Sequence, residues 1–176
     1  NPVPVPTEGG HIDFAPRNAV EFGLLEYLRQ RFGRVSYDRV VSGPGLHHIY
    51  MYFRDADPRA EQDWLGERIA AGDPAAEIAK AALDGSSELA VRSMDLFVSM
   101  YGAMAGNLAL MFMATRGVYV GGGIAPKILK KLKDGAFLAS FTQKGRFAAM
   151  MEKIPVRVIL EPKTALYGAA RIAASL

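Results

Sequence analysis

Near the start of the chain, a carboxylate and an imidazole flank a pair of glycines. Glu8 and His11 stand three positions apart, with Gly9 and Gly10 between them. Glycine lets the backbone turn sharply or approach a ligand closely. The carboxylate accepts hydrogen bonds and the imidazole accepts and donates them, so together they suit the neighbouring hydroxyls of a polyhydroxylated ligand. A Glu and a His beside glycines are more often part of a surface turn, so both interpretations stay open for this segment taken alone.

A second glycine-rich segment follows a short β-rich run. Residues 117–121 read Gly-Val-Tyr-Val-Gly and lead into Gly121, Gly122 and Gly123, after which we expect a helix. Consecutive glycines between a strand and a helix let backbone amides face a phosphate, and they remove side chains that would block a flat base. The segment has neither the G-x-G-x-x-G nor the G-K-[ST] phosphate fingerprint. It therefore indicates either a nucleotide site or a tight turn.

Composition limits the class of protein. The 176 residues are 50% hydrophobic and 22% charged, which is typical of one globular domain, with or without an extension. The absence of cysteine excludes a disulfide framework, a thiolate zinc site and a cysteine nucleophile, and favours the reducing cytoplasm. The three histidines are too few and too bunched for a structural metal site, and we interpret His47 and His48 as a solvated or helix-initial pair. The first residues have neither the basic region nor the apolar run of a targeting segment, and their alternating prolines predict an extended connector.

Charge is distributed unevenly along the chain. Residues 1–115 hold 10 basic and 15 acidic side chains, whereas residues 116–176 hold 11 basic and 3 acidic ones. Such a cationic segment could attract nucleotide phosphates or nucleic acid. The simpler interpretation is the solvated face of one amphipathic helix, formed by Lys127, Lys130, Lys131 and Lys133. A nucleic-acid-binding domain is the least favoured alternative, because the lysine block has no interleaved aromatic residues.

An uncharged stretch raises the question of a membrane span. Residues 96–115 contain no charged side chain, which is about the length that crosses a bilayer. Apolar residues nevertheless recur there at every third or fourth position, as in a core helix packed on several sides. We therefore expect a buried central helix, in which Gly102 and Gly106 let another backbone approach closely.

The remaining pattern predicts an α/β chain. Residue spacing indicates a helix over 19–32 closed by Gly33, a strand over 35–42 that carries Ser36 and Asp38, and a helix that opens at Gly43. Asp73 is the expected N-cap of the helix over 74–83. The other expected elements are helices over 61–70, 87–114 and 164–174, a helix or ordered loop over 137–146, and strands over 117–121 and 156–160.

Six short segments together resemble one known family. They are E-G-G-H-I-D-F-A-P at 8–16, V-V-S-G-P-G-L at 40–46, G-N-L-A-L at 106–110, G-V-Y-V-G-G-G-I-A-P at 117–126, K-G-R-F at 144–147 and I-P-V at 154–156. In this order and spacing they resemble bacterial glucokinase of the cysteine-free type, over essentially the whole chain. The resemblance implies a ribonuclease H-like core with inserted helices, as in the actin and hexokinase-like superfamily. It also implies that residues 1–176 form the large carboxy-terminal domain, without the amino-terminal small domain.

The resemblance implies roles for particular residues. Glu8 and His11 match the pair that holds hydroxyls of glucose. Asp38 stands where the family usually has a glutamate that contacts the sugar near its anomeric end. Because its carboxylate is one methylene shorter, either the loop shifts inward, a water bridges the gap, or the match is displaced. The segment from Ser42 to Gly45 matches the turn beneath the sugar, and Gly121 to Gly123 match the turn that contacts adenosine.

The same resemblance places other parts of the site outside this sequence. The aspartate that takes the proton from the 6-hydroxyl of glucose, and the amino-terminal phosphate-binding turn, are expected upstream. We therefore expect the parent to be an ATP- and Mg²⁺-dependent glucokinase of glycolysis, cytoplasmic and homodimeric, and this chain alone to be inactive. An alternative is the sugar-sensing module of a fused transcription regulator.

Overall fold

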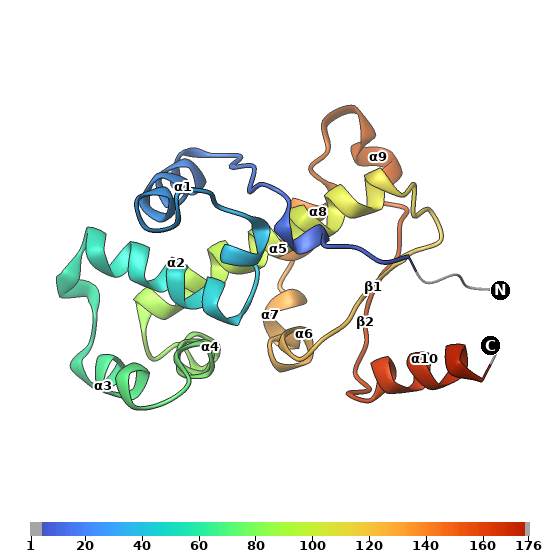
Figure 1. Cartoon of the computed structure of the whole chain (residues 1–176). Coiled ribbons are helices and arrows are strands. Elements are labelled where there is room, and N and C mark those ends of the chain that lie inside the picture. The colour runs from blue at the N-terminus through green and yellow to red at the C-terminus, as the bar shows by residue number, and fades with distance from the viewer. Residues whose placement is uncertain (1–4, 175–176) are drawn as a thin grey trace. The chain divides into compact units, whose positions relative to one another are not determined.

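The computed structural model describes residues 5–174 and divides the chain into two compact units (Figure 1). The first unit extends to Met100 and the second begins at Tyr101, so the boundary falls inside helix α5 (Glu88–Met111). Pro2 and Pro4, which belong to the predicted extended connector, lie outside the described residues.

The first unit is built from helices. They are η1 (Gly9–His11), α1 (Ala19–Phe32), η2 (Tyr37–Arg39), α2 (Gly43–Ala56), η3 (Pro58–Ala60), α3 (Asp63–Ala71), α4 (Pro74–Asp84) and the first part of α5. Helix α2 packs against α1 and α4, and α3 packs against α4. Fully buried side chains between them include Leu24, Ile49, Tyr50, Leu65 and Ile78.

Side-chain caps define where three of these helices begin. Asn18 accepts a hydrogen bond from the backbone amide of Glu21 at the start of α1, and Asp73 caps α4 as predicted. Ser42 accepts one from the amide of Gly45 at the start of α2. Because each cap satisfies an amide that has no partner within its own helix, these residues fix the start of the helix. The predicted helices over 19–32 and 74–83 are confirmed, and α3 begins two residues later than expected.

The predicted strand over 35–42 is wrong. Ser36 makes an isolated antiparallel bridge with Asp13, and the chain then enters η2. Tyr37 and Val40 are both buried although they stand three positions apart, and the amide of Val40 donates to the carbonyl of Tyr37. Burial at every third residue is the pattern of a 3₁₀ turn. The segment is rich in valine, but within the described residues no strand pairs with it beyond that single bridge.

The second unit contains both strands of the described chain. Its elements are the second part of α5, β1 (Val118–Val120), α6 (Ile124–Lys127), α7 (Leu129–Leu132), α8 (Ala136–Thr142), η4 (Gly145–Phe147), α9 (Ala148–Met151), β2 (Val156–Val158) and α10 (Thr164–Ala173). The strands pair in parallel, with Val118 opposite Val156 and Val120 opposite Val158. The α/β class is therefore confirmed, with helix predominating. The described residues form a single two-stranded sheet, so the ribonuclease H-like core is not confirmed here.

The two glycines of α5 allow close packing, as predicted. A Cβ added to Gly102 would lie 2.1 Å from the carbonyl oxygen of Phe137, and one added to Gly106 would lie 2.5 Å from that of Phe141. Both distances are too short for real atoms, so the backbone of α8 lies directly against α5 in this unit. Among residues 5–174, no helix combines the length and the hydropathy that crossing a membrane requires.

The predicted single lysine-bearing helix is wrong. The chain forms two short helices, α6 and α7, which are separated at Ile128. The Lys131 ammonium pairs with the Asp134 carboxylate at 2.7 Å, and the side chain of Lys131 is only 22% exposed. The four lysines therefore do not share one solvated helix face.

Candidate functional site

The Gly-Gly pair folds into the short helix η1, with the two predicted ligands at its ends. Glu8 is the N-cap residue and His11 is the last residue, and the amide of His11 donates to the carbonyl of Glu8 at 2.8 Å. The amide of Gly9 donates to the hydroxyl of Thr7 at 3.0 Å. The side chains of Glu8 and His11 are both exposed. Both groups therefore face solvent on this turn.

Asp38 lies on η2, and η2 contacts η1. A Cβ added to Gly10 would lie 3.8 Å from the Cβ of Asp38, which is ordinary van der Waals contact. Asp38 is exposed, as Glu8 and His11 are. The structure thus brings the three predicted sugar ligands onto two adjoining segments that are about 27 positions apart in sequence.

Backbone hydrogen bonds hold these two segments together. The amide of Phe14 donates to the carbonyl of Val35, and the amide of Tyr37 donates to the carbonyl of Ile12, both at 3.0 Å. The rings of Phe14 and Tyr37 are buried and meet edge to face, with centroids 5.6 Å apart. An apolar contact therefore lies under the polar residues and fixes the register of the two segments.

The turn from Ser42 to Gly45 supports Asp38 from the other side. The hydroxyl of Ser42 donates to the carbonyl of Asp38 at 2.6 Å and accepts a hydrogen bond from the amide of Gly45 at 3.0 Å. A Cβ on Gly45 would lie 2.6 Å from the carbonyl carbon of Val40. Gly45 therefore allows the close approach of α2 to η2, and Ser42 holds the two segments together.

A buried carboxylate that the sequence analysis did not single out fixes the chain between η1 and α1. The side chain of Glu21 is fully buried, and it accepts hydrogen bonds from the amide of Arg17 at 2.8 Å and from the guanidinium of Arg17 at 2.5 Å. The side-chain Nδ2 of Asn18 also donates to it. The Arg17 guanidinium also donates a hydrogen bond to the hydroxyl of Ser99. The spacing Asn-x-x-Glu, a variant of the capping box, was the sequence signal that could have revealed this cluster.

His47 and His48 lie in the second turn of α2 and are half-buried, so the prediction of a solvated or helix-initial pair is wrong. Burial lowers the pKa of both imidazoles below the ordinary value of 6.5. The charge of His48 lowers the pKa of His47 further. The Nδ1 atom of His48 lies 2.9 Å from the carbonyl oxygen of Arg39, which connects α2 to η2.

The predicted adenosine turn lies in the second unit, between β1 and α6. Gly121, Gly122 and Gly123 are exposed, and Gly122 has a φ of 98°, which favours glycine. Nothing lies within 4 Å of a Cβ added to Gly122 or Gly123. These glycines line a cavity of about 520 Å³, within the range of small-molecule sites. Its other lining residues are Pro126, Lys127, Ile159, Leu160, Glu161, Pro162, Thr164 and Ala165.

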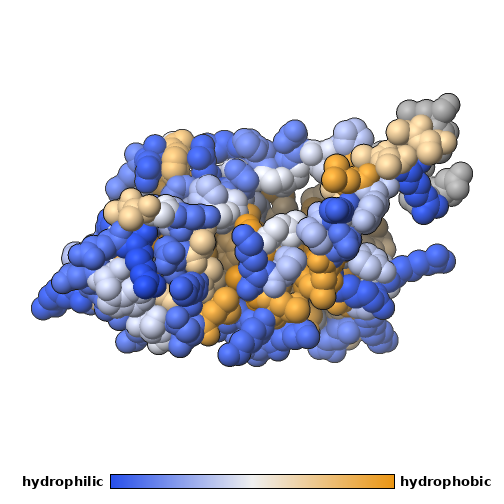
Figure 2. Space-filling view, turned by 90° about the horizontal axis from the view of Figure 1, so that it is seen from below, coloured by the Kyte–Doolittle hydropathy of each residue, from blue (hydrophilic) through white to orange (hydrophobic). Residues whose placement is uncertain are grey.

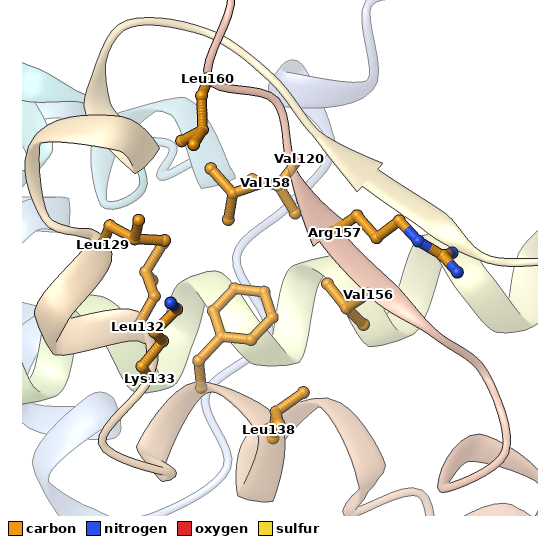
Figure 3. A pocket seen from close by; sticks show the side chains of 10 residues that line it. Val120, Leu129, Leu132, Lys133, Leu138, Val156, Arg157, Val158 and Leu160 are labelled. Carbon is orange, nitrogen blue, oxygen red and sulfur yellow. The ribbon is translucent and has the colours of Figure 1, made fainter.

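A second cavity of about 520 Å³ in this unit is apolar (Figure 3). It is lined by Val120, Leu129, Leu132, Lys133, Phe137, Leu138, Val156, Arg157, Val158 and Leu160. Val156 and Val158 face Leu129 across it, whereas Arg157 points away on the other side of β2. In Figure 2, apolar residues, coloured orange, cluster near the centre of the face in view. With few polar groups in its lining, this cavity does not suit a sugar.

Metal ligands do not cluster in the part of the chain that the structure describes. Over residues 5–174, no group of three or more His, Cys, Asp or Glu side chains is arranged to hold a metal ion.

Comparison with known proteins identifies the family. A family model described as glucokinase matches residues 1–176. The glucokinase of Trichormus variabilis is 46% identical over 97% of this chain and 54% of the relative, and that of Xanthomonas euvesicatoria is 38% identical over 97% and 48%. The crystal structure of glucokinase from an Antarctic psychrotroph matches with a TM-score of 0.81 at 30% identity, over 97% of this chain and 50% of the other. Glucokinase from Balamuthia mandrillaris in complex with glucose matches with a TM-score of 0.75 at 25% identity, over 90% and 44%. The chain spans about half the length of these relatives, and it belongs to the glucokinase family.

Proposed function

We propose that this chain supplies the glucose- and adenosine-binding part of an ATP-dependent glucokinase. The longer protein would transfer the γ-phosphoryl group of ATP to the 6-hydroxyl of glucose, in carbohydrate metabolism. The observation that carries the proposal is the match of the glucokinase family model to the whole chain. One structural relative is described as a complex with glucose, which supports the same substrate.

Glucose would bind at η1 and η2. Glu8 and Asp38 would accept hydrogen bonds from sugar hydroxyls, and His11 would accept or donate one. The contact between η1 and η2 supports this assignment, because three polar groups on adjoining segments can bind several hydroxyls of one ring. The short carboxylate of Asp38 is compatible with this role, since η2 contacts η1 and even a Cβ added to Gly10 would lie 3.8 Å from the Cβ of Asp38.

Adenosine would bind at the glycine turn. The open space beside Gly122 and Gly123 supports this assignment, because a flat base can lie against backbone that has no side chains. Mg²⁺ would enter with ATP as part of the substrate, and we derive no ligand for it from this chain. We also propose that both units belong to the large domain. Residues outside this chain would complete its ribonuclease H-like core.

The reaction needs groups that this chain does not supply. Phosphoryl transfer depends chiefly on the positioning of the reactants and on charge stabilisation around the phosphates. We propose that the aspartate that deprotonates the 6-hydroxyl lies in the rest of the longer protein. The role of this chain is then to orient the sugar and the nucleotide.

Glucose-dependent ADP release tests the proposal. The longer protein should release ADP when both glucose and ATP are present, and residues 1–176 alone should not. A longer protein that binds glucose without any ADP release would instead support the sugar-sensing module of a fused regulator, which no observation favours. Full turnover by residues 1–176 alone would contradict the division of roles.

The cellular setting and the assembly are also proposals. A sequence without cysteine is compatible with a cytoplasmic enzyme. A homodimer is expected from the family resemblance, and light scattering of the longer protein would test it: twice the mass of one chain is the expected result.

A further inference from the structure

We propose that Arg34 positions His11 for sugar binding without contacting the sugar itself. The inference rests on the proposed glucose site. Arg34 lies outside η1 and η2, directly after Gly33, which ends α1. Nothing in the sequence pattern assigned it a role, and its contacts are visible only in the fold.

Two contacts connect Arg34 to the end of η1. Its Nη2 atom donates to the carbonyl oxygen of His11 at 2.5 Å, and its Nε atom lies 2.7 Å from a carboxylate oxygen of Asp13. One planar guanidinium thus holds the backbone of one residue and the side chain of another. Because the fork is rigid, the two contacts together restrict the orientation of the chain from His11 to Asp13.

The carbonyl of His11 is a suitable acceptor for this arginine. His11 is the last residue of η1, and the carbonyls at the end of a helix have no partner within the helix. The backbone bonds between the two segments begin only at Ile12, so Arg34 extends the restraint to His11 itself.

Arg34 is in turn held in place by its own neighbours. The amide of Gly33 donates to the carbonyl of Arg29 at 2.9 Å, and the amide of Arg34 donates to the carbonyl of Phe32 at 2.8 Å. Helix α1 therefore ends in an ordered turn that aims Arg34 back towards η1. Arg34 thus connects the loop that carries His11 to the end of α1, which leads directly into the segment that carries Asp38.

The expected effect is moderate, because the pair is exposed. The side chain of Arg34 is 58% exposed and that of Asp13 is 78% exposed, so water and salt weaken their attraction. Arg34→Ala in the longer protein should raise the KM for glucose about threefold to fivefold. The KM for ATP and kcat should stay within about twofold, because the change affects a sugar ligand and not the reacting groups.

Conservative and control variants separate positioning from general stability. Arg34→Lys keeps a cation near Asp13 but loses the fork, so it should restore only part of the glucose affinity. Arg29→Ala is the matched control: this arginine of α1 is 59% exposed and pairs with Glu26. It should leave every kinetic constant near that of the unmodified protein.

Amide hydrogen exchange measures the same restraint on the loop in the absence of sugar. Arg34→Ala should speed exchange at the amides of Phe14 and Tyr37, and Arg29→Ala should not.

If exchange and the KM for glucose both stay unchanged in Arg34→Ala, or if kcat and both KM values change together, the positioning role is wrong. If His11→Ala raises the KM for glucose and Arg34→Ala does not, the role of Arg34 fails while the proposed function stands. If neither variant changes that KM but exchange rises, Arg34 holds the loop and the sugar site is misassigned.

Discussion

The two candidate binding regions differ in which groups would contact the ligand. In the η1–η2 region the binding groups are side chains, and hydrogen bonds and a buried aromatic pair hold them from below. In the turn after β1, the binding surface is backbone from which side chains are absent. The first region should therefore be sensitive to the removal of atoms from its ligands, and the second to the addition of atoms. The experiments below test this difference.

The largest effect is expected at the support of η2. Gly45→Ala places a methyl group 2.6 Å from the backbone of Val40, so η2 or α2 must move. We expect the free energy of unfolding, from urea denaturation, to fall by about 2 to 3 kcal/mol. Gly43→Ala is the control, since its added Cβ meets only the side chain of Ala75 at an ordinary 3.7 Å. Equal stability of the two variants would show that the close approach is not needed.

The next largest effect is expected at the proposed sugar ligands. Glu8→Ala or His11→Ala in the longer protein should cost about 1 to 3 kcal/mol of glucose binding, because each leaves a sugar hydroxyl without its partner. The KM for glucose should then rise about fivefold or more, and the KM for ATP should change little. Glu26→Ala, at an exposed glutamate of α1, serves as the control. An unchanged KM for glucose in both ligand variants contradicts the site.

A smaller and opposite test applies to the glycine turn. Gly123→Ala adds a methyl group to open space, so the stability of the protein should not change. If adenosine lies against the turn, the same methyl group should raise the KM for ATP about fivefold or more, without affecting the KM for glucose. Gly168→Ala is the matched control, because its added Cβ also meets nothing within 4 Å. An equal KM for ATP in the two variants would contradict the assignment of the adenosine site to this turn.

The smallest effect concerns pH. Because burial lowers the pKa of His48 below 6.5, the folded protein favours the neutral imidazole. As the pH falls below 6.5, the unfolded chain takes up the proton first, so the free energy of unfolding should decrease towards pH 5.5. His48→Gln should reduce this decrease, and urea denaturation at pH 7.5 and 5.5 measures it. Identical pH dependence in both proteins would mean that His48 does not contribute.

The sequence predicted best what local chemistry decides. The caps at Asn18 and Asp73 and the spacing of buried residues determine where α1 and α4 form, and these helices were predicted almost to the residue. The role of Gly102 and Gly106 was also predictable, since small residues four apart permit close packing. The contact between η1 and η2 followed from the family resemblance and not from any local pattern.

What the sequence did not reveal depends on contacts between distant residues. The valines near η2 suggested a strand, yet the segment forms only a single bridge, between Ser36 and Asp13, which stand more than 20 positions apart. The contact of Arg34 with His11 spans 23 positions and leaves no periodic signal. Nothing in the sequence marks the interruption at Ile128, which divides the lysines between two helices.

The most direct test is a crystal structure of the longer protein with glucose. The side chains of Glu8, His11 and Asp38 should each lie within about 3.2 Å of a sugar hydroxyl, directly or through one water at Asp38. Glucose bound elsewhere, with these three side chains still facing solvent, would contradict the central claim that η1 and η2 form the sugar site.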